Sequence, residues 1–130
     1  MSSKTVMVVD DNASIRAIVS NHLQSDGYAT QEAASAAEAL QKVAAGGIDM
    51  ILLDVMMPET DGLEVLRRLK QDPATVTIPV VIISAYGQRE NIIRAAREGA
   101  VDFIVKPFTR DVILEKVKKY LAPEAPAPSG

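Results

Sequence analysis

Short runs of consecutive apolar residues recur along this chain and restrict how it can fold. The clearest are residues 5–9 (TVMVV), 49–53 (DMILL), 79–83 (PVVII) and 101–105 (VDFIV). The first three do not alternate apolar with polar residues, which is typical of strands that helices cover on both faces of a parallel sheet. Residues 28–34 (YATQEAA) form a more polar run that suits an edge strand. We therefore expect five strands.

Each expected strand is followed by a segment in which the apolar residues have helical spacing. The first segment places Ile15, Ile18, Val19 and Leu23 on one face and ends at Gly27. The other four segments cover residues 35–46, 61–69, 88–97 and 109–121. Strict alternation of five strands with five helices predicts an α/β fold, a doubly wound parallel sheet with helices on both faces.

The composition supports a single domain and excludes several classes of site. The chain has 130 residues, 48% of them hydrophobic, which is enough for one buried core. It contains no cysteine, so disulfides and thiolate metal sites are excluded and a cytoplasmic location is expected. No apolar run approaches the roughly 20 residues of a membrane span, and the N-terminus lacks the apolar core of a signal peptide. The net charge of -3 and the aromatic content of 4% count against direct binding of nucleic acid.

Polar residues follow the expected strands at the points where the strands end. Asp10 and Asp11 follow the first strand, Asp54 the third, Ser84 the fourth and Lys106 the fifth. In open α/β sheets, ligands bind beyond the carboxyl ends of the strands. If the first and third strands are neighbours, roughly 4.8 Å apart, their three carboxylates converge. An oxygen-only cluster of this kind favours a hard divalent cation, Mg²⁺ with several waters rather than a fully caged Ca²⁺ or zinc.

Each of these residues also has an ordinary structural explanation. An acid between a strand and a helix is often the N-cap of the helix, which is an alternative role for Asp10 or Asp11. Lys106 could be a solvated lysine, although Pro107 directly after it restricts its backbone and indicates a fixed turn. The occurrence of all these groups at successive strand ends of one sheet favours a functional site.

Four separated motifs in this sequence resemble those of a known family. They are Asp10-Asp11, Asp54 followed by Met57-Pro58 and Asp61-Gly62, Ser84-Ala85, and Lys106-Pro107-Phe108. Together they resemble the receiver domains of bacterial two-component response regulators, in particular the single-domain chemotaxis type. The resemblance covers residues 4–121 and implies a flavodoxin-like (βα)5 fold with strand order 2-1-3-4-5. Residues 122–130 (APEAPAPSG) are expected to form a disordered, Pro/Ala-rich tail or the start of a linker.

The resemblance implies a role for each residue at the strand ends. Asp54 would take a phosphoryl group from the phosphohistidine of a histidine kinase. Asp11 and Asp54 would ligate Mg²⁺, with Asp10 held near it partly through water and the backbone carbonyl of Met56 completing the protein ligands. The metal and Lys106 would offset the charge of the phosphoryl oxygens. The family pattern also includes a cis peptide bond after this lysine.

The resemblance also implies a switch. Ser84 would hydrogen-bond a phosphoryl oxygen, and Phe103, three residues before Lys106, would turn inward when Ser84 moves. From the residues alone, Phe103 is more simply a core aromatic side chain of a strand. The surface that binds a downstream protein partner would be formed by the fourth helix, the fifth strand and the fifth helix. Phosphorylation-dependent dimerisation through the same elements is left open.

Two further positions bear on how long phosphorylation lasts. Met56, two residues after Asp54, and Tyr86, two residues after Ser84, occupy places that shape water access to the phosphoaspartate in the family. Neither side chain is a good base for an attacking water, and both can shield the acyl phosphate. We therefore expect the phosphorylated state to last for minutes or more rather than seconds.

Alternative functions share parts of this pattern. The chain could be a single-domain regulator, a receiver excised from a larger regulator, or a phosphorelay intermediate that passes phosphate to a histidine phosphotransfer protein. A Mg²⁺-dependent aspartyl-phosphate phosphatase generally has a second acid two residues beyond its nucleophile. This chain has Met56 there, so we expect a phosphoacceptor and not an enzyme. A dinucleotide site is excluded because the stretch DDNAS lacks a Gly-rich turn.

Overall fold

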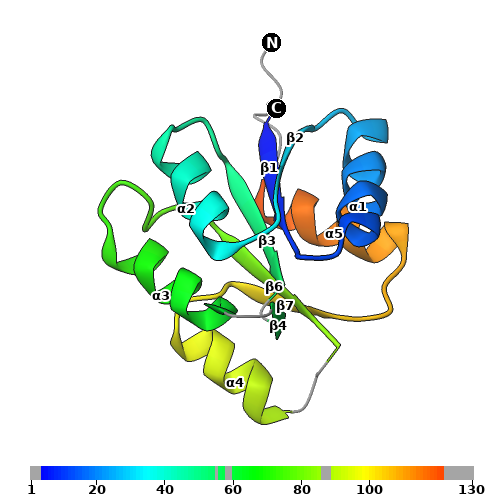
Figure 1. Ribbon diagram of the computed structural model, residues 1–130. Coiled ribbons are helices and arrows are strands. Elements are labelled where there is room, and N and C mark those ends of the chain that lie inside the picture. The colour runs from blue at the N-terminus through cyan, green and yellow to red at the C-terminus, as the bar shows by residue number, and fades with distance from the viewer. Residues whose placement is uncertain (1–3, 55, 58–59, 86–88, 122–130) are drawn as a thin grey trace, which may run out of the picture.

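A five-stranded parallel sheet forms the centre of the protein (Figure 1). The computed structural model describes residues 4–54, 56–57, 60–85 and 89–121, and the expected tail at 122–130 lies outside this description. In sheet order the strands are β2 (Ala29–Ala33), β1 (Thr5–Val9), β3 (Met50–Asp54), β6 (Val80–Ser84) and β7 (Asp102–Val105). Counted along the chain, these strands confirm the expected order 2-1-3-4-5, and all neighbours are parallel. The order reverses between β1 and β3, and their carboxyl ends therefore border the place where such sheets bind ligands.

The described helices cover both faces of this sheet, which confirms the doubly wound, flavodoxin-like fold (Figure 1). On one face lie α1 (Ala13–Ser25) and α5 (Arg110–Tyr120), which contact each other. On the other face lie α2 (Ala36–Ala44), α3 (Gly62–Gln71) and α4 (Arg89–Arg97). The sequence places the start of the fourth helix at Gln88, which is outside the described residues.

The central strands divide their apolar side chains between two core layers. In β1 and β3, odd-numbered residues such as Met7 and Leu53 pack toward α2, α3 and α4. Even-numbered residues such as Val8 and Leu52 pack toward α1 and α5. These side chains are at most 1% exposed, and burying each one stabilises the fold by roughly 1.5–3 kcal/mol. Burial on both faces explains why the runs show no polar alternation.

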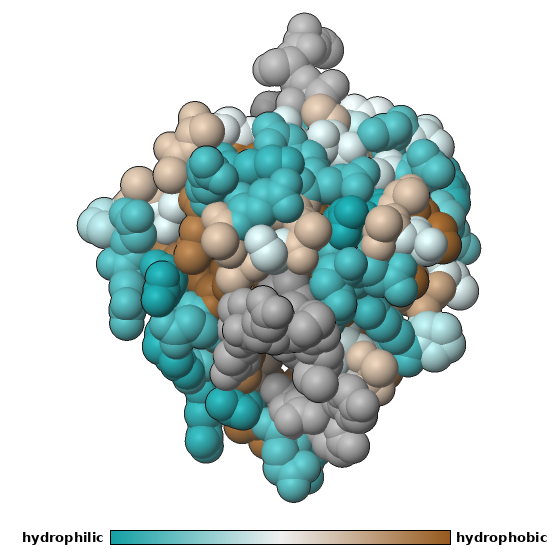
Figure 2. All heavy atoms as spheres, in the orientation of Figure 1, coloured by the Kyte–Doolittle hydropathy of each residue, from teal (hydrophilic) through white to brown (hydrophobic). Residues whose placement is uncertain are grey.

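The described surface is largely polar on the face shown in Figure 2. Hydrophilic residues cover most of this face, and apolar residues appear only in separate, smaller patches. This distribution is expected of helices that turn an apolar stripe toward a sheet. Among the described residues, no helix combines the length and the apolar character that a membrane crossing requires.

Strand boundaries after the core runs differ from the prediction by one residue. β3 includes Asp54 and β6 includes Ser84, because the parallel ladder continues through both residues. A short antiparallel hairpin, β4 (Met56–Met57) with β5 (Thr60–Asp61), follows β3 and has no counterpart in the sequence prediction. Strands of this length are too short to produce a periodic pattern.

The prediction that Ile18 belongs to the buried face of α1 is wrong, because this residue is 46% exposed. The helix buries Val19 and Leu23 as expected, but it also buries the polar Ser20. Arg16 contacts β2 from the same side of the helix. The buried face of α1 therefore includes polar positions and is rotated away from Ile18.

Candidate functional site

The carboxyl ends of β1 and β3 bring three acidic side chains together. Asp10 follows β1, Asp11 comes next in the chain, and Asp54 is the last residue of β3. One carboxylate oxygen of each residue lies within 4.8 Å of those of the other two. Asp10 and Asp54 are each 3% exposed, whereas Asp11 is exposed to solvent. We refer to these three residues as the acidic cluster.

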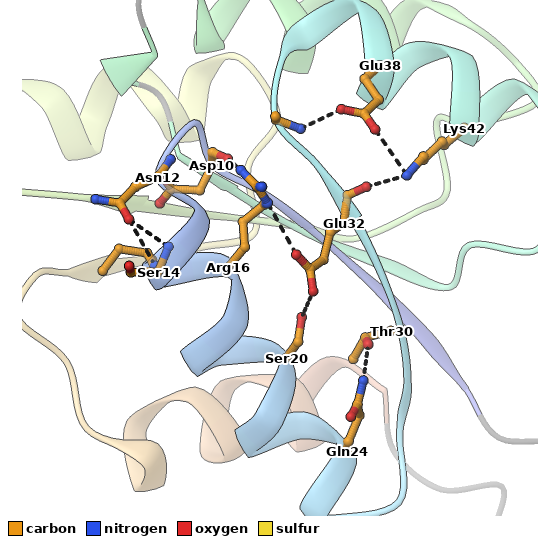
Figure 3. A network of polar contacts seen from close by, with 12 residues as sticks. Asp10, Asn12, Ser14, Arg16, Ser20, Gln24, Thr30, Glu32, Glu38 and Lys42 are labelled. Atoms are coloured by element: carbon orange, nitrogen blue, oxygen red, sulfur yellow. Dashed lines mark hydrogen bonds and ion pairs between the residues drawn. The ribbon is translucent and has the colours of Figure 1, made fainter.

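The N-cap of α1 is Asn12 and neither of the neighbouring acids. Its Oδ1 atom accepts hydrogen bonds from the backbone N–H groups of Ser14 and Ile15 at 2.9 and 3.1 Å (Figure 3). The carboxylate of Asp10 instead accepts a hydrogen bond from the N–H of Asn12 at 2.9 Å. The alternative in which Asp10 or Asp11 caps the helix is therefore wrong.

Lys106 places its ammonium group against two of the three carboxylates. Its Nζ atom donates to Asp54 Oδ2 at 3.2 Å and to Asp10 Oδ2 at 3.3 Å. Burial by itself would lower the pKa of Lys106. The Coulombic attraction of Asp54 and Asp10, together with their hydrogen bonds, outweighs burial and raises the pKa above its ordinary value. The site therefore holds Lys106 as a cation.

The backbone fixes Lys106 next to the end of β6. The N–H of Lys106 donates to the carbonyl of Ser84 at 2.8 Å. Ser84 is the last residue of β6 and is 1% exposed. The Lys106–Pro107 peptide bond is cis, as the resemblance implies. The hydroxyl and ammonium groups that the sequence singles out thus come from the ends of two paired strands.

The donor set of the acidic cluster suits a hard divalent cation. All three groups are carboxylates, whereas softer metals prefer cysteine or histidine ligands. Three carboxylates against the ammonium of Lys106 leave an excess of negative charge at the cluster. At a separation of about 4 Å and an effective dielectric near 20, each pair of like charges repels by on the order of 4 kcal/mol. A divalent cation offsets this repulsion, and the residues fit Mg²⁺, which binds through a few carboxylates and keeps several waters.

Phe103 lies in β7 and packs, half-buried, against the core layer of α2, α3 and α4. It borders a pocket of about 200 Å³ between α4 and β7. The other residues that line this pocket are Ile92, Ala95, Ala96, Ala100, Val101 and Asp102. The packing supports the interpretation of Phe103 as a core aromatic residue, and its switch role stays a prediction.

Met56 and Tyr86 are the two positions that the sequence relates to dephosphorylation, and the structure does not describe the side chain of either. Met56 belongs to the hairpin directly after Asp54, but its side chain lies outside the described part of the structure. Tyr86 and Pro58 lie outside the described residues altogether. The roles of Met56 and Tyr86 therefore rest on the sequence.

The structure adds Arg16 to the surroundings of the acidic cluster, which the sequence analysis did not place there. Its Nη1 atom donates to the backbone carbonyl of Asp10 at 2.7 Å, and its Nε atom pairs with Glu32 of β2 at 3.2 Å (Figure 3). A pattern in the sequence could have indicated this contact. The polar residues Arg16, Ser20 and Gln24 lie at the i, i+4, i+8 spacing of one helix face. A polar stripe on a helix that packs against a sheet indicates polar partners on that sheet.

Comparison with known sequences relates this site to characterised proteins. The model of the response regulator receiver domain family matches residues 6–118. The phosphate regulon transcriptional regulatory protein PhoB of Pseudomonas aeruginosa is 38% identical over 129 residues, which cover 99% of this chain and 56% of that protein. The chemotaxis protein CheY of Bacillus subtilis is 38% identical over 117 residues, which cover 89% of this chain and 96% of that protein. The chain spans about half the length of PhoB and of the transcriptional regulatory protein ResD of Bacillus subtilis, 56% and 47% respectively.

Solved structures show the same fold over nearly the whole chain. The chemotaxis protein CheY4 of Vibrio cholerae matches with a TM-score of 0.88 at 31% identity, covering 92% of this chain and 100% of that one. A response regulator from Thermotoga maritima matches with a TM-score of 0.84 at 35% identity, covering 93% of this chain and 99% of that one.

The repulsion within the acidic cluster predicts that one acid can be removed with a gain in stability. We expect Asp11→Asn to raise the free energy of unfolding of the metal-free protein at low salt by about 1 kcal/mol. The change removes one of three like charges, and the gain is small because solvent screens most of the repulsion of the exposed Asp11. We also expect the stabilisation by saturating Mg²⁺ to shrink. Urea unfolding with EDTA and with Mg²⁺ measures both effects. Glu115→Gln, which neutralises an exposed acid of α5, is the control, and an equal gain in that variant would contradict the explanation.

Proposed function

This chain belongs to the response regulator receiver domain family, and we propose that Asp54 accepts a phosphoryl group from the phosphohistidine of a histidine kinase or histidine phosphotransfer protein. The observation that carries the proposal is the convergence of Asp10, Asp11 and Asp54 with the ammonium group of Lys106. Members of this family are signalling phosphoacceptors and not enzymes in the usual sense.

Asp54 is the nucleophile in the proposed transfer. One of its carboxylate oxygens attacks the phosphorus atom, so that a P–O bond forms while the P–N bond to the imidazole breaks. The imidazole nitrogen keeps the electron pair of the broken bond and takes up a proton from solvent. Lys106, which lies 3.2 Å from Asp54, is placed to donate hydrogen bonds to the phosphoryl oxygens. Burial of Asp54 limits competition from bulk water.

Asp10, Asp11 and Asp54, with the backbone carbonyl of Met56, would hold Mg²⁺. When bound, the ion neutralises charge on the phosphoryl oxygens and orients the group. The contribution of the chain itself is to keep the carboxylates and the ammonium group in place beforehand. The ends of β1 and β3 do this, together with the hydrogen bond from Asn12 to Asp10.

Ser84 and Phe103 would convert the phosphoryl group into a change of shape. Phe103 pairs with Ile82, and Ser84 comes two residues later in the same strand, so a movement of Ser84 acts on the strand pair that carries Phe103. Reversing an equilibrium from 1:99 to 99:1 needs about 5.5 kcal/mol. Charge-assisted hydrogen bonds contribute roughly 1.5–3 kcal/mol each, so two bonds at the upper end of this range, or three near its middle, supply this free energy.

The face formed by α4, β7 and α5 is the proposed docking surface for a downstream protein, or for a second copy of the chain after phosphorylation. Ile92 and Ile93 of α4, and Val101 and Val105 in and beside β7, are between 38% and 44% exposed. Exposed aliphatic side chains such as these provide affinity when a partner covers them. The proposal includes no direct contact with nucleic acid or membrane.

Three settings are compatible with this function. The match to nearly all of CheY supports a regulator that acts alone, whereas the match to about half of PhoB and ResD supports a receiver joined to an output domain. A phosphorelay intermediate would use the same site chemistry. In each setting, we propose that phosphorylation in the cytoplasm changes the affinity for a protein partner.

Intact-mass measurement after incubation with Mg²⁺ and acetyl phosphate tests the phosphoacceptor. We expect one phosphoryl adduct on the wild-type protein and none on Asp54→Asn or with EDTA, because the nucleophile or the metal is then missing. Asp111→Asn, which removes an exposed aspartate of α5, is the matched control and should be phosphorylated normally. A folded wild-type protein without an adduct would contradict the proposal, as would an undiminished adduct on Asp54→Asn.

The lifetime of the phosphoaspartate provides a separate prediction. Met56→Asn combined with Tyr86→Glu should accelerate dephosphorylation several-fold, because the new polar groups can orient or activate an attacking water. Decay of the phosphorylated mass after removal of the donor measures the rate, which in the wild type should correspond to minutes or more. Val76→Asn, which changes an exposed apolar residue elsewhere, is the control. An unchanged rate in the double variant would exclude a role for these two positions.

A further inference from the structure

Arg16 connects the edge strand β2 to the backbone of Asp10 (Figure 3). Its Nη1 atom donates to the Asp10 carbonyl at 2.7 Å, and its Nε atom lies 3.2 Å from Glu32 Oε1. The other carboxylate oxygen of Glu32 accepts a hydrogen bond from the hydroxyl of Ser20 at 3.1 Å. Ser20 is 3% exposed and the Arg16 side chain 17% exposed. Glu32 of β2 therefore holds the guanidinium group, and Ser20 of α1 in turn holds Glu32.

Both backbone polar groups of Asp10 are hydrogen-bonded, and one of them is bonded to Arg16. The N–H of Asp10 donates to the carbonyl of Ala33 in β2 at 3.1 Å, while the carbonyl accepts from Arg16. Only Asp11 and Asn12 separate Asp10 from the start of α1, and the N–H of Arg16 donates to the carbonyl of Asn12 at 3.1 Å. The loop that carries two members of the acidic cluster is thus fixed at both of its ends. The side chain of Arg16 holds the end at Asp10, whereas its backbone N–H holds the end at Asn12.

We propose that Arg16 is a positioning residue for the metal site. Its guanidinium group, held by Glu32, fixes the Asp10 carbonyl and keeps the carboxylates of Asp10 and Asp11 at metal-binding spacing before an ion arrives. This inference rests on the proposed function of the acidic cluster as a Mg²⁺ site. Without the contact, like-charge repulsion favours loop conformations that separate the carboxylates, and the ion has to reorder the loop as it binds.

Two explanations of the role of Arg16 predict opposite effects of its removal on Mg²⁺ binding: one through its charge, the other through its positioning of the loop. A cation close to the acidic cluster repels Mg²⁺, so the loss of its charge alone leaves Glu32 unneutralised and tightens the binding of the ion. Loss of positioning weakens the binding, because part of the binding free energy is then used to reorder the loop. The sign of the change therefore separates the two explanations.

Calorimetric titration of the metal-free protein with Mg²⁺ shows whether replacing Arg16 weakens or tightens the binding of the ion. We expect the dissociation constant of Arg16→Met to rise about tenfold, as is usual when a group that orients metal ligands is removed. Arg16→Lys keeps the charge but lacks the planar fork, so it should also bind Mg²⁺ more weakly, and it replaces Arg16→Met if that variant does not fold. Gln24→Met is the matched control, because it removes another contact between α1 and β2, from Gln24 Nε2 to Thr30 Oγ1 at 2.7 Å. It should bind Mg²⁺ like the wild type.

Amide hydrogen exchange of the metal-free protein provides a second readout that needs no ion. The amide of Asn12, which donates to the carboxylate of Asp10, should exchange faster in Arg16→Met and at the wild-type rate in Gln24→Met. Unchanged or tighter Mg²⁺ binding by the Arg16 variants would overturn the inference, and so would equal weakening in Gln24→Met. A wild-type protein that binds no Mg²⁺ would instead overturn the proposed metal site, and the inference with it.

Discussion

The proposed function depends on keeping three carboxylates close together at one edge of a sheet. Oxygens of Asp10, Asp11 and Asp54 lie within 4.8 Å of one another, and the repulsion between them has to be offset by the rest of the fold. The two core layers support β1 and β3 on both faces, so the strand ends that carry the acids cannot easily separate. Lys106 adds a local counter-charge at 3.2 and 3.3 Å. We expect this arrangement to destabilise the metal-free protein, and the same arrangement suits it to a divalent cation.

The same sheet relates the acidic cluster to the proposed output surface. Lys106 follows β7 and bonds to the backbone of Ser84 at the end of β6, and Phe103 lies within that strand pair beside α4. A phosphoryl group that contacts Ser84 and Lys106 would therefore act on the two strands that support the exposed residues of α4 and β7. This short connection is the physical basis for proposing that phosphorylation changes partner affinity.

Much of the fold can be predicted from the sequence, because β1, β3 and β6 are buried on both faces and their apolar runs have no other simple explanation. Strand order needed the family resemblance, since local patterns do not say which strands pair. The acids were recognisable because they come directly at strand ends. The cap of α1 was not, because Asp10, Asp11 and Asn12 are consecutive residues that all suit an N-cap. The exposure of Ile18 and the contacts of Arg16 depend on the polar residues of β2, which only the tertiary structure brings to α1.

A crystal structure of the protein grown with Mn²⁺ tests the central claim most directly. Mn²⁺ binds at the oxygen sites that Mg²⁺ uses, and its anomalous scattering identifies it without reference to an assumed ligand set. The account predicts a strong anomalous peak among the carboxylates of Asp10, Asp11 and Asp54. An ordered acidic cluster without such a peak, in a crystal that holds Mn²⁺ elsewhere, would contradict the view that the fold brings these acids together to bind a metal.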